Sequence, residues 1–175
     1  ECELIGDTED KDIHIIANLP YNVGTALLVK WMTAQKWKPW FSSLTLMFQK
    51  EVGMRIVAEP RSKAYGRLSV LCQYRADVEI LFDIPRQAFI PPPKVTSSIV
   101  HITPRSEAVD APKQKILERV VSAAFNQRRK MLRASLKALG TDPSPKLYAA
   151  GILETARAEE LSVEDFSKLA LEYQS

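Results

Sequence analysis

The chain has 175 residues, of which 46% are hydrophobic, and its formal net charge is +3. This length allows one sizeable core, or one core with a small second domain, and the sequence holds no run of about 18 apolar residues that would cross a membrane. The two cysteines, Cys2 and Cys72, are too few for a disulfide framework or a cysteine metal cluster, so we expect a cytoplasmic protein without a bound metal.

Patterns typical of strands and of helices alternate along the first part of the chain. Residues 12–17 are rich in isoleucine and precede a proline loop, which favours a buried parallel strand. Residues 24–35 repeat apolar side chains at helical spacing and predict a helix. A second apolar strand is predicted over 44–48, followed by a helix over 49–59 that ends before a proline.

Three further elements are predicted before residue 105. Residues 66–74 place apolar side chains on one side of a helix. Residues 78–82 and 97–103 are strand-like and are joined by a proline-rich loop, which favours an antiparallel pair at the edge of the sheet.

The pattern becomes entirely helical after a polar, linker-like stretch at 105–112. Apolar stripes over 116–124 and 132–139 predict helices, and Gly140 is the expected stop of the second. Ser162 and Asp165 resemble a capped helix start, with aspartate in place of the usual glutamate. We therefore predict an α/β domain over residues 1–105 and a small all-helical domain over 106–175.

Glycine is scarce, and no two of the six glycines are close enough to form a Gly-x-Gly loop. A nucleoside cofactor usually lies against such a loop after the first strand of an α/β sheet. Either the protein binds no such cofactor, or the first strands lie outside the given chain. The start of the chain next to a buried strand favours the second interpretation.

The tetrapeptide Asn18-Leu19-Pro20-Tyr21 follows the first predicted strand, at the sheet edge where ligands bind. Adenine N6 is a poor nucleophile because its lone pair is delocalised. The Asn18 and Leu19 carbonyls can accept hydrogen bonds from its two N–H groups, which favours a pyramidal nitrogen. Pro20 can stiffen the loop, and Tyr21 can stack on the base. The alternative is an ordinary turn with Asn18 near the cap of the next helix.

A second motif, Phe89-Ile90-Pro91-Pro92-Pro93-Lys94-Val95, precedes the last predicted strand. Three consecutive prolines form a stiff extended segment that can hold Phe89 in place. An aromatic ring held opposite Tyr21 would make a two-sided clamp for a base removed from its stack. The alternative is that Phe89 is a core residue beneath a loop.

Basic residues are concentrated in two blocks. Six lie between residues 50 and 75, and eight lie between 113 and 137, where Glu118 is the one acid. Two such blocks in a nearly neutral chain suggest a face that binds a polyanion, although solvated helix faces would give the same pattern.

The combination of NLPY with FxPPPKVxS resembles the ribosomal RNA adenine dimethyltransferases. The segments 62–70 (SKAYGRLSV) and 126–130 (NQRRK) are similar to the small-subunit branch of that family, the kasugamycin-resistance methyltransferases of bacteria. The resemblance extends from about residue 13 to residue 169, and its four motifs occur in the same order.

This resemblance implies the C-terminal half of a Rossmann-like class I methyltransferase sheet, followed by a small helical domain. It implies transfer of methyl groups from S-adenosylmethionine to N6 of two neighbouring adenosines in small-subunit ribosomal RNA, and a role in subunit maturation. Asn18 would contact both the cofactor and the target amine, Leu19 would accept the second amine hydrogen, and Tyr21 and Phe89 would enclose the adenine. The glycine-rich cofactor loop of the family would lie upstream of Glu1, so the chain alone is expected to be inactive.

The resemblance gives the basic residues a role as phosphate ligands for the RNA of the small ribosomal subunit. The expected ligands come from both blocks and from the proline loop: Lys63, Arg67, Lys94, Arg128, Arg129, Lys130 and Arg133. Arg128 or Arg129 could equally pair with an acid between the domains. A monomer is expected, because the sequence contains neither a repeat nor an exposed heptad.

Two other functions remain open. One is a non-catalytic relative that uses the same fold to bind nucleic acid, against which the intact NLPY argues. The other is methylation of adenine in DNA, which the helical tail and the PPPKV loop disfavour.

Overall fold

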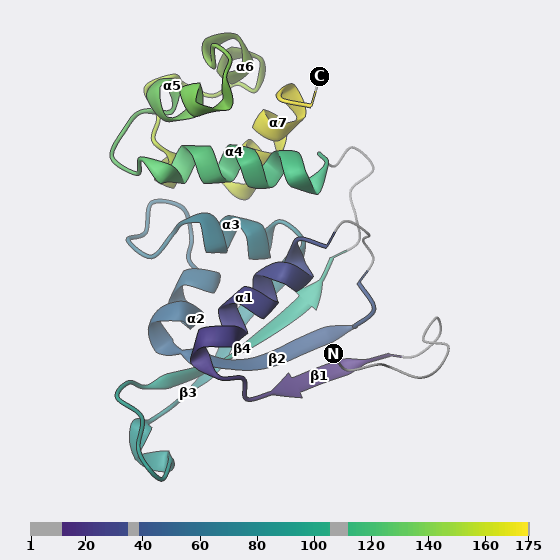
Figure 1. The fold of residues 1–175 in the computed structure, drawn as a ribbon, viewed down its shortest axis with the longest axis vertical. Helices are drawn as coiled ribbons and strands as arrows, with labels where there is room; N and C mark the ends of the chain where they lie inside the picture. The colour runs from purple at the N-terminus through teal and green to yellow at the C-terminus, as the bar shows by residue number, and fades with distance from the viewer. Residues whose placement is uncertain (1–11, 35–38, 106–111, 175) are drawn as a thin grey trace.

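The computed structural model describes residues 12–34, 39–105 and 112–174. Its α/β region is built on a four-stranded mixed sheet (Figure 1). The strands are β1 (His14–Ala17), β2 (Ser43–Gln49), β3 (Ala76–Ile84) and β4 (Ser97–Pro104), in the order β1-β2-β4-β3. β1 and β2 are parallel, as predicted for the first strand, and β4 is antiparallel to both β2 and β3.

Three helices lie on one face of this sheet: α1 (Tyr21–Met32), α2 (Lys50–Ile56) and α3 (Arg67–Gln73) (Figure 1). Gly53 of α2 allows a close approach to β4, because a Cβ atom there would lie 3.2 Å from the Cβ of Ser98. The helices predicted at 49–59 and 66–74 are present as α2 and α3, each with shorter bounds than predicted. No described helix covers the opposite face of the sheet.

The prediction that the first strand is buried is wrong for the described part of the chain. Ile15 packs into the core beneath the helices, but Ile16 points to the opposite face and is 82% exposed. β1 pairs with β2 alone among the described strands, so it is an edge strand here. The antiparallel pair β3–β4 is confirmed. Of these two strands only β3 is at an edge of the sheet, because β4 lies between β2 and β3.

The strand register places several chain segments at one end of the sheet. Gln49 at the end of β2 pairs with Ser97 at the start of β4, and Ser97 pairs with Ile84 at the end of β3. β1 also ends there, because Ala17 pairs with Leu46 in parallel register. The loop after β1 and the loop between β3 and β4 therefore emerge from the same edge.

The second region is helical, as predicted. It contains α4 (Gln114–Asn126), α5 (Leu132–Ser135), α6 (Ser144–Ala149) and α7 (Val163–Glu172), with short 3-10 turns η2 (Leu136–Leu139) and η3 (Ala158–Glu160). The predicted stop at Gly140 is confirmed by its left-handed φ of 86°. The predicted capping box is confirmed too: the Asp165 N–H donates to Ser162 Oγ at 3.1 Å, and the Ser162 N–H donates to Asp165 Oδ2 at 3.0 Å.

Two hydrophobic clusters form the interior. One lies between the sheet and its helices, around Leu28, Leu46 and Ile102. The other lies within the helical region, around Leu117, Leu136 and Phe166, and it also takes in Tyr65 and Val70 from before residue 105. The expected linker falls largely on residues 106–111, which lie outside the described residues, and the division into domains 1–105 and 106–175 stays a prediction. None of the described helices has the length and apolar character needed to cross a membrane.

Cys72 is a buried thiol whose reactivity reports on this core. Its side chain is 0% exposed, and burial raises the pKa of the thiol to about 12. In a Cys2→Ser variant, where Cys72 is the one remaining thiol, we expect no rapid reaction with Ellman's reagent at about pH 8. One equivalent should react once guanidinium unfolds the protein. Rapid, complete reaction of the folded protein would contradict this packing.

Candidate active site and nucleic-acid interface

Residues 18–20 form a short connection between β1 and α1. Pro20 is the N-cap of α1: its carbonyl accepts hydrogen bonds from the N–H groups of Val23 and Gly24, at 2.9 and 3.0 Å. The helix therefore begins at Tyr21, three residues before the predicted start. Asn18 lies two residues before this N-cap, as in the alternative of an ordinary turn, but no side chain caps α1 with a hydrogen bond.

Asn18 is exposed, and its side chain forms no hydrogen bond with any described residue. The carbonyl of Leu19 likewise accepts no hydrogen bond from a described residue. Both groups lie just beyond the carboxyl end of β1, where open α/β sheets bind ligands. Two carbonyl acceptors are therefore available on consecutive residues.

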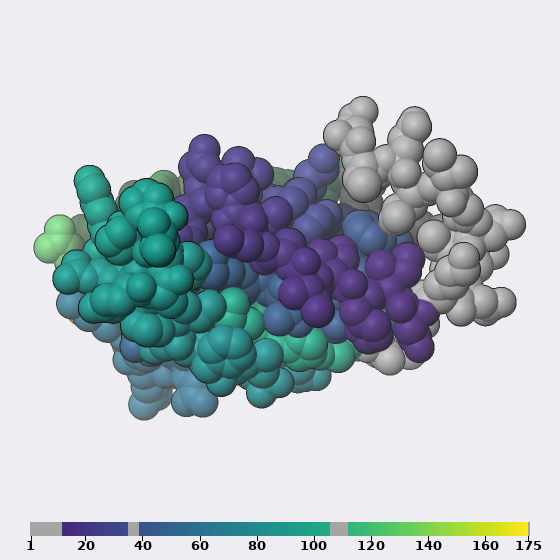
Figure 2. Space-filling view, turned by 90° about the horizontal axis from the view of Figure 1, so that it is seen from below, coloured from purple at the N-terminus to yellow at the C-terminus, as the bar shows by residue number. Residues whose placement is uncertain are grey.

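Tyr21 connects the two motifs. Its hydroxyl shares a 2.7 Å hydrogen bond with the hydroxyl of Ser97, the first residue of β4, which lies 76 positions later. Ser97 is fully buried, so this end of the tyrosine is held at a fixed point of the sheet. Figure 2 shows the β3–β4 loop next to the β1–α1 segment on the lower side of the molecule.

Phe89 lies in the β3–β4 loop, after the 3-10 turn η1 (Arg86–Ala88), in extended conformation. Its side chain is half-buried, so it is not a residue of either hydrophobic core. The rings of Phe89 and Tyr21 do not contact each other. A clamp for an intervening base requires such a separation, and the clamp itself stays a prediction. Lys94, in the same loop, is exposed.

The base of this loop is fixed by a polar network that the sequence did not reveal. Lys50 Nζ lies 2.5 Å from Asp83 Oδ2, and the Ser98 hydroxyl donates to Asp83 Oδ1 at 2.6 Å. The hydrogen bonds from Lys50 and then from Ser98 hold the pKa of the Asp83 carboxyl below its usual value. The Lys50 N–H also donates to the Thr96 carbonyl at 2.9 Å. The ends of β2, β3 and β4 are thus joined beneath the loop.

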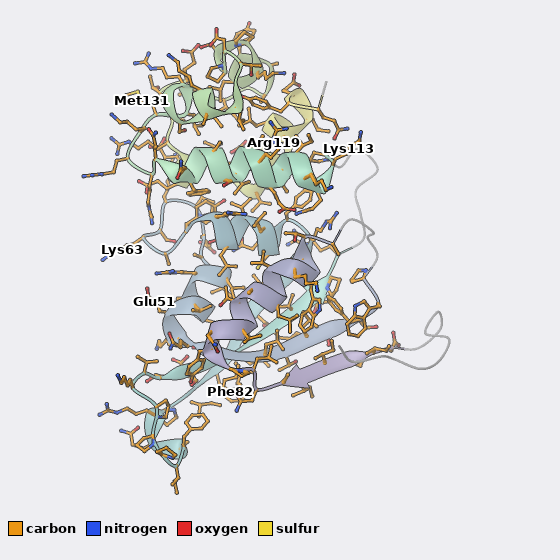
Figure 3. All side chains as sticks on the ribbon, viewed as in Figure 1. Glu51, Lys63, Phe82, Lys113, Arg119 and Met131 are labelled. Atoms are coloured by element: carbon orange, nitrogen blue, oxygen red, sulfur yellow. The ribbon has the colours of Figure 1, made fainter. Side chains whose placement is uncertain are left out.

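The predicted RNA-binding residues are exposed in both regions. Besides Lys94 of the β3–β4 loop, Lys63 lies between α2 and α3 and Arg67 at the start of α3. Four more lie at the α4–α5 turn and in α5: Arg128, Arg129, Lys130 and Arg133. Figure 3 shows Lys63 and Met131, which directly follows this turn, projecting from the same side of the molecule.

Arg128 differs from the other basic residues because its guanidinium has partners. Its Nε donates to Glu159 Oε2 at 3.0 Å, and its Nη2 donates to the Lys63 carbonyl at 2.9 Å. The alternative considered for Arg128, a pairing with an acid, is the one that the structure contains. Arg129, Lys130 and Arg133 form no ion pair with any described residue.

Within the described ranges, His, Cys, Asp and Glu side chains do not gather in groups of three that could hold a metal ion. The acceptors available at the sheet edge are carbonyl oxygens, which suit the N–H groups of an amine or a base.

The chain is similar in sequence to known proteins. Residues 4–175 match the family model described as "Ribosomal RNA adenine dimethylase". The chain is 58% identical over 167 residues to "Ribosomal RNA small subunit methyltransferase A" of Xanthobacter autotrophicus, covering 95% of the chain and 57% of that relative. The protein of the same name from Azorhizobium caulinodans is 61% identical over 159 residues, covering 91% of the chain and 54% of the relative. The chain therefore spans about half the length of the curated relatives it matches.

Solved structures share the fold. A dimethyladenosine transferase from Plasmodium falciparum superposes with a TM-score of 0.74 at 24% identity, covering 99% of the chain and 70% of that protein. The 23S rRNA methyltransferase ErmE gives a TM-score of 0.62 at 21% identity, covering 97% of the chain and 68% of that protein. The predicted Rossmann-like methyltransferase fold is confirmed.

Proposed function

Since the chain belongs to the ribosomal RNA adenine dimethylase family, we propose that it forms the target-base site and much of the RNA-binding surface of an rRNA adenine-N6 dimethyltransferase. The substrate we propose is small-subunit ribosomal RNA, modified on two adjacent adenosines during subunit maturation in the cytoplasm. The observation that carries the proposal is the Tyr21–Ser97 hydrogen bond, which brings NLPY and the FxPPPKVxS segment to one sheet edge beside the unpartnered Asn18.

The acceptors of the 18–19 segment supply the first part of the mechanism. The side-chain carbonyl of Asn18 and the backbone carbonyl of Leu19 accept hydrogen bonds from the two N6–H groups of the target adenine. This arrangement favours a pyramidal nitrogen whose lone pair is localised toward the methyl donor. Asn18 and Leu19 would thereby hold the amine ready for a methyl group that the bound donor would supply, and the N6 proton would pass to water. The local structure supports this role because Pro20 commits its own carbonyl to α1 while the Leu19 carbonyl stays uncommitted.

The aromatic residues supply the second part. Tyr21 and Phe89 stack on the two faces of the flipped adenine, each contact stabilising binding by about 1–3 kcal/mol. Ser97 and the Asp83 network hold the two segments that carry these rings. Rigid placement keeps the amine close to its acceptors, which matters because small displacements of reacting groups lower rates steeply.

The cofactor that the family implies is S-adenosylmethionine, whose positively charged sulfur supplies the methyl group and leaves as a neutral thioether. Asn18 is the residue of this chain that we assign to the cofactor. An exposed amide at the carboxyl end of β1 fits that task, since neither its acceptor nor its donors are bonded to a described residue.

The exposed cations supply the RNA contacts in this proposal. Lys63, Arg67, Lys94, Arg129, Lys130 and Arg133 bind phosphates, which orients the RNA without reading its sequence. Arg128 is left out of this set because Glu159 already pairs with it.

The test compares the complete reading frame that contains these residues with the 175-residue chain. Each is incubated with labelled S-adenosylmethionine and unmethylated small ribosomal subunits, and the digested RNA is searched for N6,N6-dimethyladenosine by mass spectrometry. We expect the product from the complete frame. If the complete frame binds the subunits and makes no product, a non-catalytic nucleic-acid-binding protein replaces the proposed enzyme.

A further inference from the structure

The turn between α2 and α3 is attached to the helical region by one backbone and one side-chain hydrogen bond. The Arg61 N–H donates to the Glu159 carbonyl at 2.7 Å, and the Tyr65 hydroxyl donates to the Leu161 carbonyl at 2.9 Å. Arg61 has a positive φ of 69°, a conformation that is costly for a residue other than glycine. Contacts with the helical region therefore hold this turn, which carries Lys63, in one particular shape.

Arg128 adds a further connection between the α2–α3 turn and the helical region. It lies in the α4–α5 turn, and its guanidinium bridges an acceptor from each region: the Glu159 carboxylate at 3.0 Å and the Lys63 carbonyl at 2.9 Å. The side chains of Arg128 and Glu159 are 44% and 32% exposed, so the pair is partly shielded from solvent. A planar guanidinium with several fixed donors suits two acceptors in different directions, whereas a lysine ammonium acts as a point charge.

The neighbours of this bridge are the unpaired cations of the proposed RNA surface. Lys63 supplies a carbonyl to Arg128 while its own ammonium is exposed, and Arg129 and Lys130 follow Arg128 directly in the chain. The backbone segments that carry these three cations are thus tied together at one point. Their shared placement also fixes their distance from the 18–21 segment, because the α2–α3 turn belongs to the region that contains the sheet.

We propose that Arg128 is a positioning residue that joins Lys63, Arg129 and Lys130 into one phosphate-binding surface with a fixed orientation to the target-base site. The inference rests on the proposed function and adds to it a residue that sets the position of the RNA relative to the target-base site. Arg128 contacts no RNA in this proposal. Its bridge determines which adenosine reaches Asn18 once the phosphates are bound.

The experiment exchanges charge and geometry separately at two adjacent arginines. Arg128→Lys keeps the charge but removes the fork that spans two acceptors, and Arg128→Gln removes both. Arg129→Lys and Arg129→Gln are the matched controls at a residue without a partner. Binding of a small-subunit rRNA transcript is measured over a range of salt concentrations. The sites of dimethylation in unmethylated subunits, with kcat and KM, are measured in the complete frame.

Both Arg128 variants should behave alike: KM rises about tenfold, methyl groups appear at incorrect adenosines, and the salt dependence of binding keeps its slope. Arg129→Lys, which keeps the charge but not the fork of donors, should weaken RNA binding and keep the slope of log K against log salt. Arg129→Gln should weaken binding further and lower that slope by about 0.7 to 0.9, and methylation in both Arg129 variants should stay at the correct adenosines. Thermal unfolding identifies the temperature range in which every variant is folded, so that a purely structural role would leave KM and site choice unchanged there.

Three results would overturn the inference. If Arg128→Lys retains normal KM while Arg128→Gln alone lowers the salt slope, Arg128 is itself a phosphate ligand. If both variants match the unmodified protein in KM and site choice while folded, the bridge does not influence which adenosine is methylated. If the unmodified protein binds no rRNA transcript, the proposed function fails first and this inference fails with it.

Discussion

Asn18→Ala is expected to lower methyl transfer by about 10²–10³-fold or more while leaving RNA affinity nearly unchanged. In the proposed mechanism the amide oxygen accepts a hydrogen bond from one of the two N6–H groups, and alanine has no acceptor to replace it. The loss should appear in kcat, because the acceptor matters most when the nitrogen becomes pyramidal. Folding should be unaffected, since the Asn18 side chain is exposed and bonds to none of the residues that the structure describes.

A neighbouring asparagine provides the control. Asn22 is exposed in the first turn of α1 and carries no proposed role, so Asn22→Ala should retain normal activity. Product formation is measured by mass spectrometry of the digested rRNA, and affinity by filter binding. Normal methyl transfer by Asn18→Ala would eliminate the acceptor mechanism. A large loss of RNA affinity with normal kcat would make Asn18 an RNA ligand instead.

Features that depend on neighbouring residues were predictable from the sequence. Apolar periodicity located the strands and helices of the α/β region, and Ser162 with Asp165 forms the capping box expected from their spacing. Boundaries failed where the cap is unusual. α1 begins at Tyr21 because the Pro20 carbonyl accepts its first hydrogen bonds, and a proline before a helix carries no side-chain capping signal.

Edge and core placement was harder to predict. An isoleucine-rich strand reads as buried on both faces, but burial depends on what covers each face. In the described residues the helices cover one face, which partly buries Ile15 and leaves Ile16 exposed. Composition alone does not contain that information.

The sequence motifs pointed to the residues of the candidate site, but not to the residues that hold them in place. Asn18, Tyr21 and Phe89 were identified because they occur in unusual sequence patterns. Ser97 and Asp83 were missed as supporting residues, since their partners are set by sheet register. Tyr21 and Ser97 are 76 residues apart, and no local pattern indicates that their hydroxyls meet.

Tyr65 is the residue for which we expect the largest effect on stability. It is fully buried, it packs edge-on against Phe125, and its hydroxyl donates to the Leu161 carbonyl at 2.9 Å. Tyr65→Ala should lower the free energy of unfolding by about 3–5 kcal/mol, because it leaves a large cavity between the α2–α3 turn and the helical core. Urea unfolding followed by circular dichroism measures this change.

Removing the hydroxyl alone separates packing from hydrogen bonding. Tyr65→Phe keeps the ring but leaves the Leu161 carbonyl without its donor, and should cost about 1–3 kcal/mol. Tyr148 is 87% exposed, so Tyr148→Phe should change stability by less than about 0.5 kcal/mol. If Tyr65→Phe is as stable as the unmodified protein, the hydroxyl does not hold the two regions together.

The same hydroxyl predicts a loss of stability in alkali. Burial, and then the negative charges of Glu164 and Asp165, raise the pKa of Tyr65 above its ordinary value of 10.0. The folded protein therefore keeps this proton at pH values where the unfolded chain releases it. By linkage, the contribution of Tyr65 to stability is complete below about pH 10 and declines as the pH rises above that value. Tyr65→Phe lacks this titration, so the stability difference between the two proteins should shrink in alkali. A difference that stays constant from about pH 8 to 11 would mean that the hydroxyl ionises equally in both states, which its burial against the Leu161 carbonyl does not allow.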